Sequence, residues 1–286
     1  VQTFFVVKIK GEKIMIIDTH VHSGSMLSFN MPEATVLKAI EKYNIDIALV
    51  SNCQASECDH QQILLPQEVQ VPQIVCAENS VRFAKENPGK IFAAIWVKPQ
   101  QEYPDEQLIN LIESNLDVIK AIKIHAYHSA VPFDGDRVEP YIQLADRLNL
   151  PVITHTGTND TDSVDRVYNM ALRFPKVNFV MAHMGLGSDN SRATQLIGKL
   201  PNLYGDTTWV PMENTIKFIK KVGSHKIMFG SDMPIDGLDT YHHNPFGQRS
   251  IYQDYFYELP KLISKEDYDN VMWKTAVYLF KLPVHV

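Results

Sequence analysis

Two histidines separated by one residue, His20 and His22, closely follow a short apolar run at residues 14–17. Four apolar residues bounded by polar ones are typical of a buried strand, which would place the histidines at its carboxyl end. Side chains two residues apart on a strand point to the same side, so both imidazoles can face one divalent transition metal. Because two polar residues at a strand exit give the same pattern, the pair indicates a metal site only if further ligands occur elsewhere.

Further candidate ligands stand at the ends of other apolar runs. His155 follows one in VITHTG, His183 another in VMAHMG, and Asp232 a third in MFGSDMP. Each has a purely structural alternative, because the histidines could be buried and hydrogen-bonded and Asp232 could cap a helix. Histidine nitrogens with a carboxylate suit Zn²⁺ best among the divalent ions, with Mn²⁺, Fe²⁺ and Co²⁺ as alternatives. Their joint occurrence predicts a divalent metal cofactor.

A regular alternation of apolar runs and amphipathic segments would bring these residues together. Strands are predicted at residues 14–22, 46–51, 91–97, 118–124, 151–154, 177–182, from 203 onward, and 226–229. Helices are predicted at residues 32–43, 77–86, 105–114, 139–149, 164–174, 192–200 and 212–222, then at 248–259 and 265–280. Eight strands alternating with helices predict the α/β class and a (β/α)8 TIM barrel, in which the strand ends meet at one face. A Rossmann sheet fits less well, since its Gly-rich first turn is absent.

Three parts of the chain lie outside this repeat. Residues 3–13 predict a small N-terminal extension, as a hairpin or a strand, and the two C-terminal helices are additional. The irregular segment 53–87 is expected to carry a loop over one end of the barrel. Since no low-complexity linker interrupts the pattern, residues 1–286 are expected to form a single barrel domain.

Composition limits the partners. The net charge of −6 carries no runs of like sign, which argues against nucleic-acid or acidic-membrane partners that need a basic face. No apolar run approaches the length that spans a membrane. Three cysteines match no zinc-ribbon spacing and favour reduced thiols in a cytoplasmic protein. A small-molecule substrate is the expected partner, and a homo-oligomer is left open.

The motifs also carry a resemblance. DTHVH, VITHTG, VMAHMG and GSDMP, spread over residues 15–234, resemble the corresponding motifs of the amidohydrolase superfamily, more closely its amidohydrolase-2 branch. That branch includes decarboxylases similar to aminocarboxymuconate semialdehyde decarboxylase, and dicarboxylate lactonases. The resemblance implies a metal site formed by His20, His22, His155 and Asp232. It implies that His183 contacts the substrate or a metal-bound water.

The segment AIKIHAYH resembles the fourth-strand motif of some members and contains Lys123 and His125. In many members this lysine is carboxylated and bridges two metals, whereas the decarboxylase-like members hold one. We expect one metal, with Lys123 as a cation that pairs with a carboxylate or an anionic substrate. His125 is expected to be a substrate contact or an extra ligand. Arg192, like Arg166 and Arg249, is a candidate for binding a substrate carboxylate, although each also fits a solvated helix position.

These residues suggest a mechanism. A bound divalent ion makes hydroxide available at neutral pH, Asp232 can shuttle its proton, and His183 can stabilise an oxyanion. The main expectation is hydrolysis of a small-molecule amide, ester or lactone, and the alternative is decarboxylation of a small unsaturated or aromatic carboxylate. A catalytically inactive barrel that only binds metal or ligand should lack a ligand, and none is missing. Histidines without a strand-end context are expected at the surface, and these are His60, His128, His225 and His285.

Overall fold

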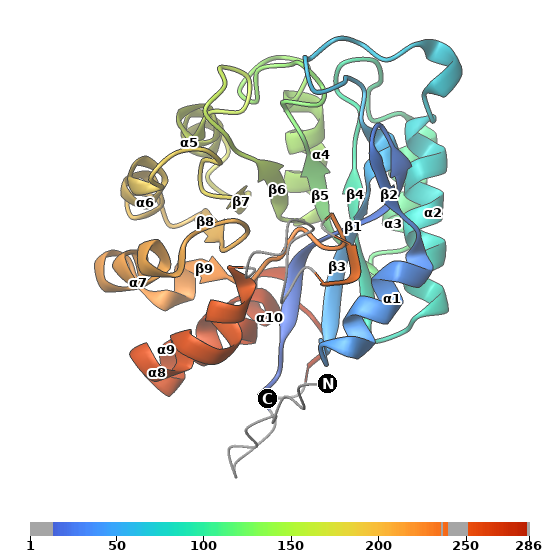
Figure 1. Ribbon diagram of the computed structural model, residues 1–286. Coiled ribbons are helices and arrows are strands. Elements are labelled where there is room, and N and C mark those ends of the chain that lie inside the picture. The colour runs from blue at the N-terminus through green and yellow to red at the C-terminus, as the bar shows by residue number, and fades with distance from the viewer. Residues whose placement is uncertain (1–13, 236, 240–250, 285–286) are drawn as a thin grey trace.

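The computed structural model describes residues 14–235, 237–239 and 251–284. In this part of the chain, one curled sheet has the strand order β2-β1-β3-β4-β5-β6-β7-β8-β9, and all neighbours except β1 and β2 are parallel (Figure 1). The strands are β1 (Ile17–Met26), β2 (Phe29–Met31), β3 (Ile47–Asn52), β4 (Ile91–Trp96), β5 (Ile119–Ile124), β6 (Val152–His155), β7 (Phe179–Ala182), β8 (Leu203–Asp206) and β9 (Ile227–Met228). The eight parallel strands confirm the predicted α/β barrel.

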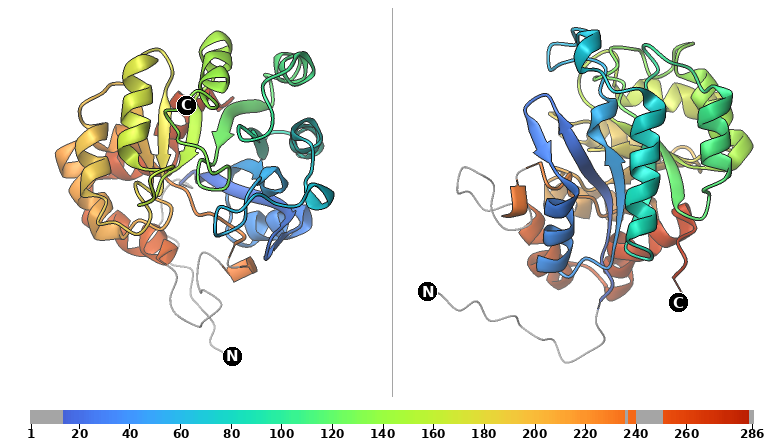
Figure 2. Two further views of the ribbon diagram at one scale, coloured as in Figure 1. Left: turned by 90° about the horizontal axis from the view of Figure 1, so that it is seen from above. Right: turned by 90° about the vertical axis from the view of Figure 1, so that its right-hand side faces the viewer.

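Helices surround the sheet, as the view from above shows (Figure 2). They are α1 (Glu33–Lys42), α2 (Gln73–Glu86), α3 (Glu106–Glu113), α4 (Glu139–Leu148), α5 (Val164–Arg173), α6 (Ser191–Ile197), α7 (Met212–Lys221), α8 (Leu259–Leu262), α9 (Lys265–Asp269) and α10 (Thr275–Phe280). Each longer helix buries one apolar face; α5, for example, buries Val167, Met170 and Ala171. The described helices therefore follow the predicted alternation closely. None of them combines the length and apolarity needed to cross a membrane.

Hydrogen bonds between β1 and the segment after β9 close the sheet. The Thr19 amide donates to the Phe229 carbonyl at 3.0 Å and the Asp232 amide donates to the His20 carbonyl at 2.8 Å. The His22 amide then donates to the Met233 carbonyl at 2.9 Å. This closure sets Asp232 directly beside the two histidines, although more than 200 residues separate them in the sequence.

Apolar side chains fill one end of the barrel. Ile17, Leu49 and Phe92 belong to an inner cluster that also contains Leu279 and Phe280 of α10. All five are buried, so α10 covers the end at which the strands begin. The polar residues are left at the opposite end, where the strands finish and catalytic residues of such barrels lie.

Some predicted boundaries were wrong. We expected the first strand to end at His22, but β1 continues to Met26 and turns back into antiparallel β2, because the chain beyond the barrel rim pairs with itself. The C-terminal stretch includes π-helical turns at Asp254–Glu258 and Asn270–Lys274. The predicted extension at residues 3–13 and the start of the helix predicted from residue 248 lie outside the described residues.

Candidate active site

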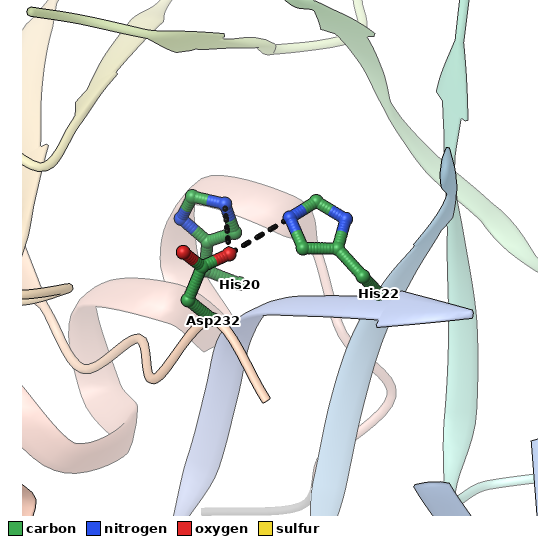
Figure 3. A group of neighbouring side chains, drawn as sticks. All are labelled: His20, His22 and Asp232. Atoms are coloured by element: carbon green, nitrogen blue, oxygen red, sulfur yellow. Dashed lines mark ion pairs between the residues drawn. The ribbon is translucent and has the colours of Figure 1, made fainter. Parts of the chain in front are cut away.

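His20, His22 and Asp232 form a compact group at the carboxyl ends of the strands (Figure 3). One potential ligand atom from each lies within 4.8 Å of the other two, and all three residues are buried. His22 Nε2 is 2.9 Å and His20 Nε2 is 3.5 Å from Asp232 Oδ1. This two-nitrogen, one-oxygen set is the donor chemistry of a divalent transition metal site.

Asp232 is held by its backbone and by a neighbouring indole. Its φ angle of 66° lies in the left-handed region, which non-glycine residues adopt rarely and mostly where surrounding contacts require it. The bond from its amide to the His20 carbonyl is such a contact. Trp209 Nε1 donates to Asp232 Oδ2 at 3.0 Å, which leaves Oδ1 facing the histidines. The carboxylate is thus oriented before any ligand arrives.

Asp206, at the end of β8, positions His20 and was not singled out from the sequence. His20 Nδ1 donates to Asp206 Oδ2 at 2.9 Å, so Nε2 carries the lone pair that a metal would need. Asp206 Oδ1 accepts from the backbone amides of His183 at 2.8 Å and Thr208 at 3.1 Å. The signal was present, since LYGD also places a carboxylate at a strand end. His22 is held similarly, with Nδ1 2.9 Å from Ser51 Oγ.

Asp206→Asn is expected to weaken metal binding by about 10- to 100-fold while the fold is kept. The amide oxygen can still accept the backbone N–H groups, but its NH₂ group cannot accept the proton on His20 Nδ1. His20 would then lose the tautomer that leaves Nε2 free. Metal affinity measured by competition with a chelator tests this, with Asp269→Asn as control, because that buried carboxylate pairs with Lys265. Equal affinity in wild type and Asp206→Asn would contradict the role.

The site groups have the protonation states that metal binding needs. Burial lowers the pKa of His22 to about 4, so this imidazole is neutral at neutral pH. Burial alone would raise the pKa of the Asp232 carboxyl, but the imidazoles of His20 and His22 hold it well below its usual value. Neutral imidazoles and an ionised carboxylate are the ligand forms.

His183 and His155 line the same cavity without joining the three-residue group. The His183 ring lies 5.0 Å from the His20 ring, between centroids, and its buried Nδ1 has no hydrogen-bond partner among the residues that the structure describes. The His155 ring lies 4.6 Å from that of His183, and its Nε2 is 3.3 Å from Asp162 Oδ2. No nitrogen of His155 lies within 4.8 Å of all three group atoms. Its role as a fourth ligand therefore stays a prediction.

Lys123 is buried beneath the metal group. Its Nζ donates to His20 Nε2 at 3.1 Å, so in this structure the lysine engages the atom that would bind the metal and would have to turn away from it when the metal binds. The side chain is 1% exposed. Burial lowers the pKa of its ammonium to about 8, although Asp206 and Asp232 act in the opposite direction. A cation at this position balances the two carboxylates around the site.

The structure separates the other two candidates, His125 and Arg192. The His125 ring stacks between Trp96 and His155, with centroid distances of 5.1 and 4.1 Å. It forms part of the cavity wall. Arg192 instead lies on the outer surface, where its guanidinium is half-exposed and pairs with Asp165. Its expected contact with substrate is wrong for this conformation, because helix periodicity alone does not say toward which neighbour a long side chain turns.

A cavity of about 280 Å³ opens beside the metal group. It confirms the expected loop, since residues 53–60 supply part of its wall. The surface location expected for His128 is wrong, because its side chain is buried and lines this cavity, while exposed His60 also lines it. The lining residues are His20, His22, Phe29, Met31, Cys53, Ser56, His60, Trp96, His125, Tyr127, His128, His155, Asn159, His183, Leu186, Asp232 and Ile235.

Solved structures with similar folds include aromatic-acid decarboxylases, a 4-oxalomesaconate hydratase and amidohydrolases. 5-Carboxyvanillate decarboxylase from Sphingomonas paucimobilis is 13% identical with a TM-score of 0.68, covering 94% of this chain and 100% of its own. The enzyme of the same name from Novosphingobium aromaticivorans, in complex with manganese and 4-hydroxy-3-methoxy-5-nitrobenzoic acid, is 12% identical with a TM-score of 0.70, covering 94% and 96%. 2,6-Dihydroxybenzoate decarboxylase from Rhizobium is 15% identical with a TM-score of 0.63, covering 94% and 99%. At these identities the likeness concerns the fold.

The sequence itself decides the family. No curated protein matches the chain. The model of the amidohydrolase family, however, matches residues 64–282, which is most of the chain and includes three of the strand-end residues singled out above, His155, His183 and Asp232. Together with the barrel and the buried histidine–aspartate group, this match confirms the resemblance seen in the motifs. The chain belongs to the amidohydrolase family.

Proposed function

We propose that the protein is a metal-dependent decarboxylase of a small aromatic or unsaturated carboxylate. The observation that carries this proposal is the cavity beside the metal group, whose wall is built from flat rings. Trp96, His125 and His155 stack in one row, with interplanar angles of 14° and 13°. A volume of about 280 Å³ suits a single-ring molecule. The fold shared with aromatic-acid decarboxylases supports the same reaction class.

His20, His22 and Asp232 would hold the metal, with His155 as the fourth residue of the set. The donor set fits a divalent ion because Asp206 keeps His20 Nε2 unprotonated. We infer Zn²⁺ or Mn²⁺, since both accept nitrogen and carboxylate ligands and a relative was crystallised with manganese. When bound, the ion would act as a Lewis acid that polarises the substrate's oxygens.

Asp232 would move the proton that decarboxylation requires. The bond from the ring carbon to the carboxylate breaks, the electron pair stays on that carbon, and a proton must take the place of CO₂. Asp232 can take a proton from a substrate hydroxyl or water and return it to the carbon. His183, which lines the cavity, can donate a hydrogen bond from its Nε2 to a substrate oxygen.

Hydrolysis of an amide, ester or lactone is the second candidate. The specific observation in its favour is the position of His183 on the cavity wall, with its ring centroid 5.0 Å from that of His20, where it could stabilise the oxyanion formed from an attacked carbonyl. Asp232 would then act as the proton shuttle between water and leaving group.

A screen of the metal-loaded protein separates these functions. We expect CO₂ release from at least one hydroxylated or unsaturated aromatic acid, and incorporation of deuterium at the vacated carbon in D₂O. Lactones, esters and amides form the comparison panel. Cleavage of a panel compound without CO₂ release would overturn the proposal in favour of hydrolysis. Full metal occupancy without any turnover would favour a barrel that only binds metal or ligand.

Lys123→Ala is expected to keep about one metal per chain, because the proposed ligands all belong to other residues. The measurement is the metal-to-protein ratio by elemental analysis. Lys120→Ala is a matched control, since Lys120 lies on the same strand, β5, but is not fully buried. A wild-type ratio near two that falls in Lys123→Ala and is restored by a short carboxylic acid would instead show a carboxylated lysine that bridges two ions.

A further inference from the structure

A short turn after β5 carries two imidazoles, His125 and His128, whose rings lie 4.5 Å apart between centroids. Both are buried, and both line the cavity. The backbone amide of His128 donates to His125 Nδ1 at 3.3 Å. His128 Nδ1 in turn lies 2.9 Å from the carbonyl oxygen of Cys58. Each ring therefore has one nitrogen engaged by the backbone.

These bonds assign the protons of the two rings. A nitrogen that accepts an N–H bond carries no hydrogen, so neutral His125 has its proton on Nε2. A nitrogen that faces a carbonyl must donate, so His128 is protonated on Nδ1. Burial lowers the pKa of His128 to about 4, which leaves a lone pair on its Nε2 at neutral pH. One ring thus offers a donor and the other an acceptor.

Both Nε2 atoms are available to a ligand. Within the described protein, the closest hydrogen bonds of both side chains involve Nδ1, and His128 has a further, weaker contact with the backbone of Asp59. Neither is among the buried, unpartnered side-chain atoms that are sealed from solvent. Because both rings line the cavity, we infer that each Nε2 faces it.

The pair is rigid. The carbonyl oxygen of His128 accepts from the amides of Glu57 at 3.0 Å and Cys58 at 2.7 Å, which ties the turn to the loop over the barrel. The Glu57 carboxylate accepts from two further amides, Gln100 and Gln101, at 3.0 and 2.7 Å. The stacking of His125 between Trp96 and His155 fixes its ring plane. Rigid polar groups discriminate between ligands because they cannot turn to suit a wrong one.

We propose that His125 and His128 are a specificity-determining pair that binds one hydroxyl group of the substrate. His125 Nε2–H donates to the hydroxyl oxygen, and His128 Nε2 accepts the hydroxyl hydrogen. A methoxy group can satisfy His125 but has no hydrogen for His128, and a carboxylate likewise has none. The identity of the substrate as an aromatic carboxylate rests on the proposed function, whereas the preference for a hydroxyl rests on the pair alone.

The test is equilibrium binding of matched probes to the metal-loaded protein by titration calorimetry. The probes are 2-, 3- and 4-hydroxybenzoate and the three corresponding methoxybenzoates. We expect at least one hydroxybenzoate to bind about tenfold more tightly than its methyl ether. The methyl ether leaves the buried acceptor His128 Nε2 without a hydrogen bond, which costs about tenfold or more in affinity. No turnover is needed for this measurement.

Two variants should act differently. His128→Leu should reduce the hydroxy-to-methoxy affinity ratio to below about threefold by weakening only the hydroxy probe, and His128→Gln, which can present an amide oxygen, should restore part of it. His125→Phe should weaken both probes, because both use its donor. His225→Leu is the control, as it removes an exposed imidazole that does not line the cavity and should leave the ratio unchanged. Melting temperature and metal content identify any variant that fails to fold.

Three outcomes would contradict the proposed role of His125 and His128. They are equal affinity for every hydroxy and methoxy probe, an unchanged ratio in His128→Leu, and an equal loss of the ratio in His225→Leu. The binding result does not depend on the reaction type. A hydroxyl preference without CO₂ release would contradict the decarboxylase proposal but support the role of His125 and His128. CO₂ release without any hydroxyl preference would support the decarboxylase proposal but contradict the role of the two histidines.

Discussion

Asp232→Asn is expected to lower kcat by at least about 10³-fold while the fold is retained, because the amide can neither take up nor return the proton in the chemical step. The substitution is nearly isosteric, and Trp209 Nε1 can still donate to the side-chain oxygen. Circular dichroism should therefore match wild type. Metal content should be measured in parallel, since the amide is also a poorer ligand than the carboxylate.

Trp209→Phe is the matched comparison for this prediction. It removes the N–H group that orients Asp232 Oδ2 but keeps the carboxylate, so a loss of only about tenfold is expected from a single hydrogen bond. A much lower kcat in Asp232→Asn than in Trp209→Phe would show that the carboxylate itself is needed. Wild-type turnover in correctly folded, metal-loaded Asp232→Asn would remove Asp232 from the proton-transfer role.

His20→Ala and His22→Ala are each expected to lose most of the bound metal and nearly all activity. Each change removes one of the three ligand atoms that the structure groups within 4.8 Å. Only two of these closely grouped donors remain, and even with the proposed ligand His155 as a third they would bind a divalent ion far more weakly. Elemental analysis of protein dialysed against a weak chelator gives the occupancy directly.

The exposed His225 provides the control for these variants. His225→Ala removes the same side chain from a surface turn and should keep full metal and activity. The effect on metal affinity should also be graded, with His20→Ala losing more than Asp206→Asn, because the aspartate acts only through His20. Full occupancy in either His20→Ala or His22→Ala would mean that the metal lies elsewhere.

The sequence alone predicted which residues lie close together, because in a barrel the residues at the carboxyl ends of all strands lie on one face. Apolar runs with period-two or continuous burial predict strands, and eight of them with intervening helices leave few topologies. A polar residue at the end of such a strand must lie on the catalytic face. His20, His22 and Asp232 were predicted on that basis, and the structure groups them.

Loops and long side chains were not predictable in the same way. His128 follows no strand directly, and only the loop that carries Cys58 gives its ring a buried partner. Arg192 occupies a helix start next to predicted strand ends, yet it turns outward to Asp165 because an exposed charge pair costs less than burying a guanidinium. Neither outcome follows from hydrophobic periodicity.

The sequence by itself determined the barrel, the side on which His20 and His22 lie, and the family, because these depend on residue order and strand alternation. Only the tertiary structure decided how each site group is oriented. Asp206 sets the tautomer of His20, Trp209 orients Asp232, and a backbone carbonyl sets the tautomer of His128. These bonds join residues from 23 to 186 positions apart. Barrel closure and loop packing bring these hydrogen-bond partners together, and no local pattern in the sequence predicts that pairing.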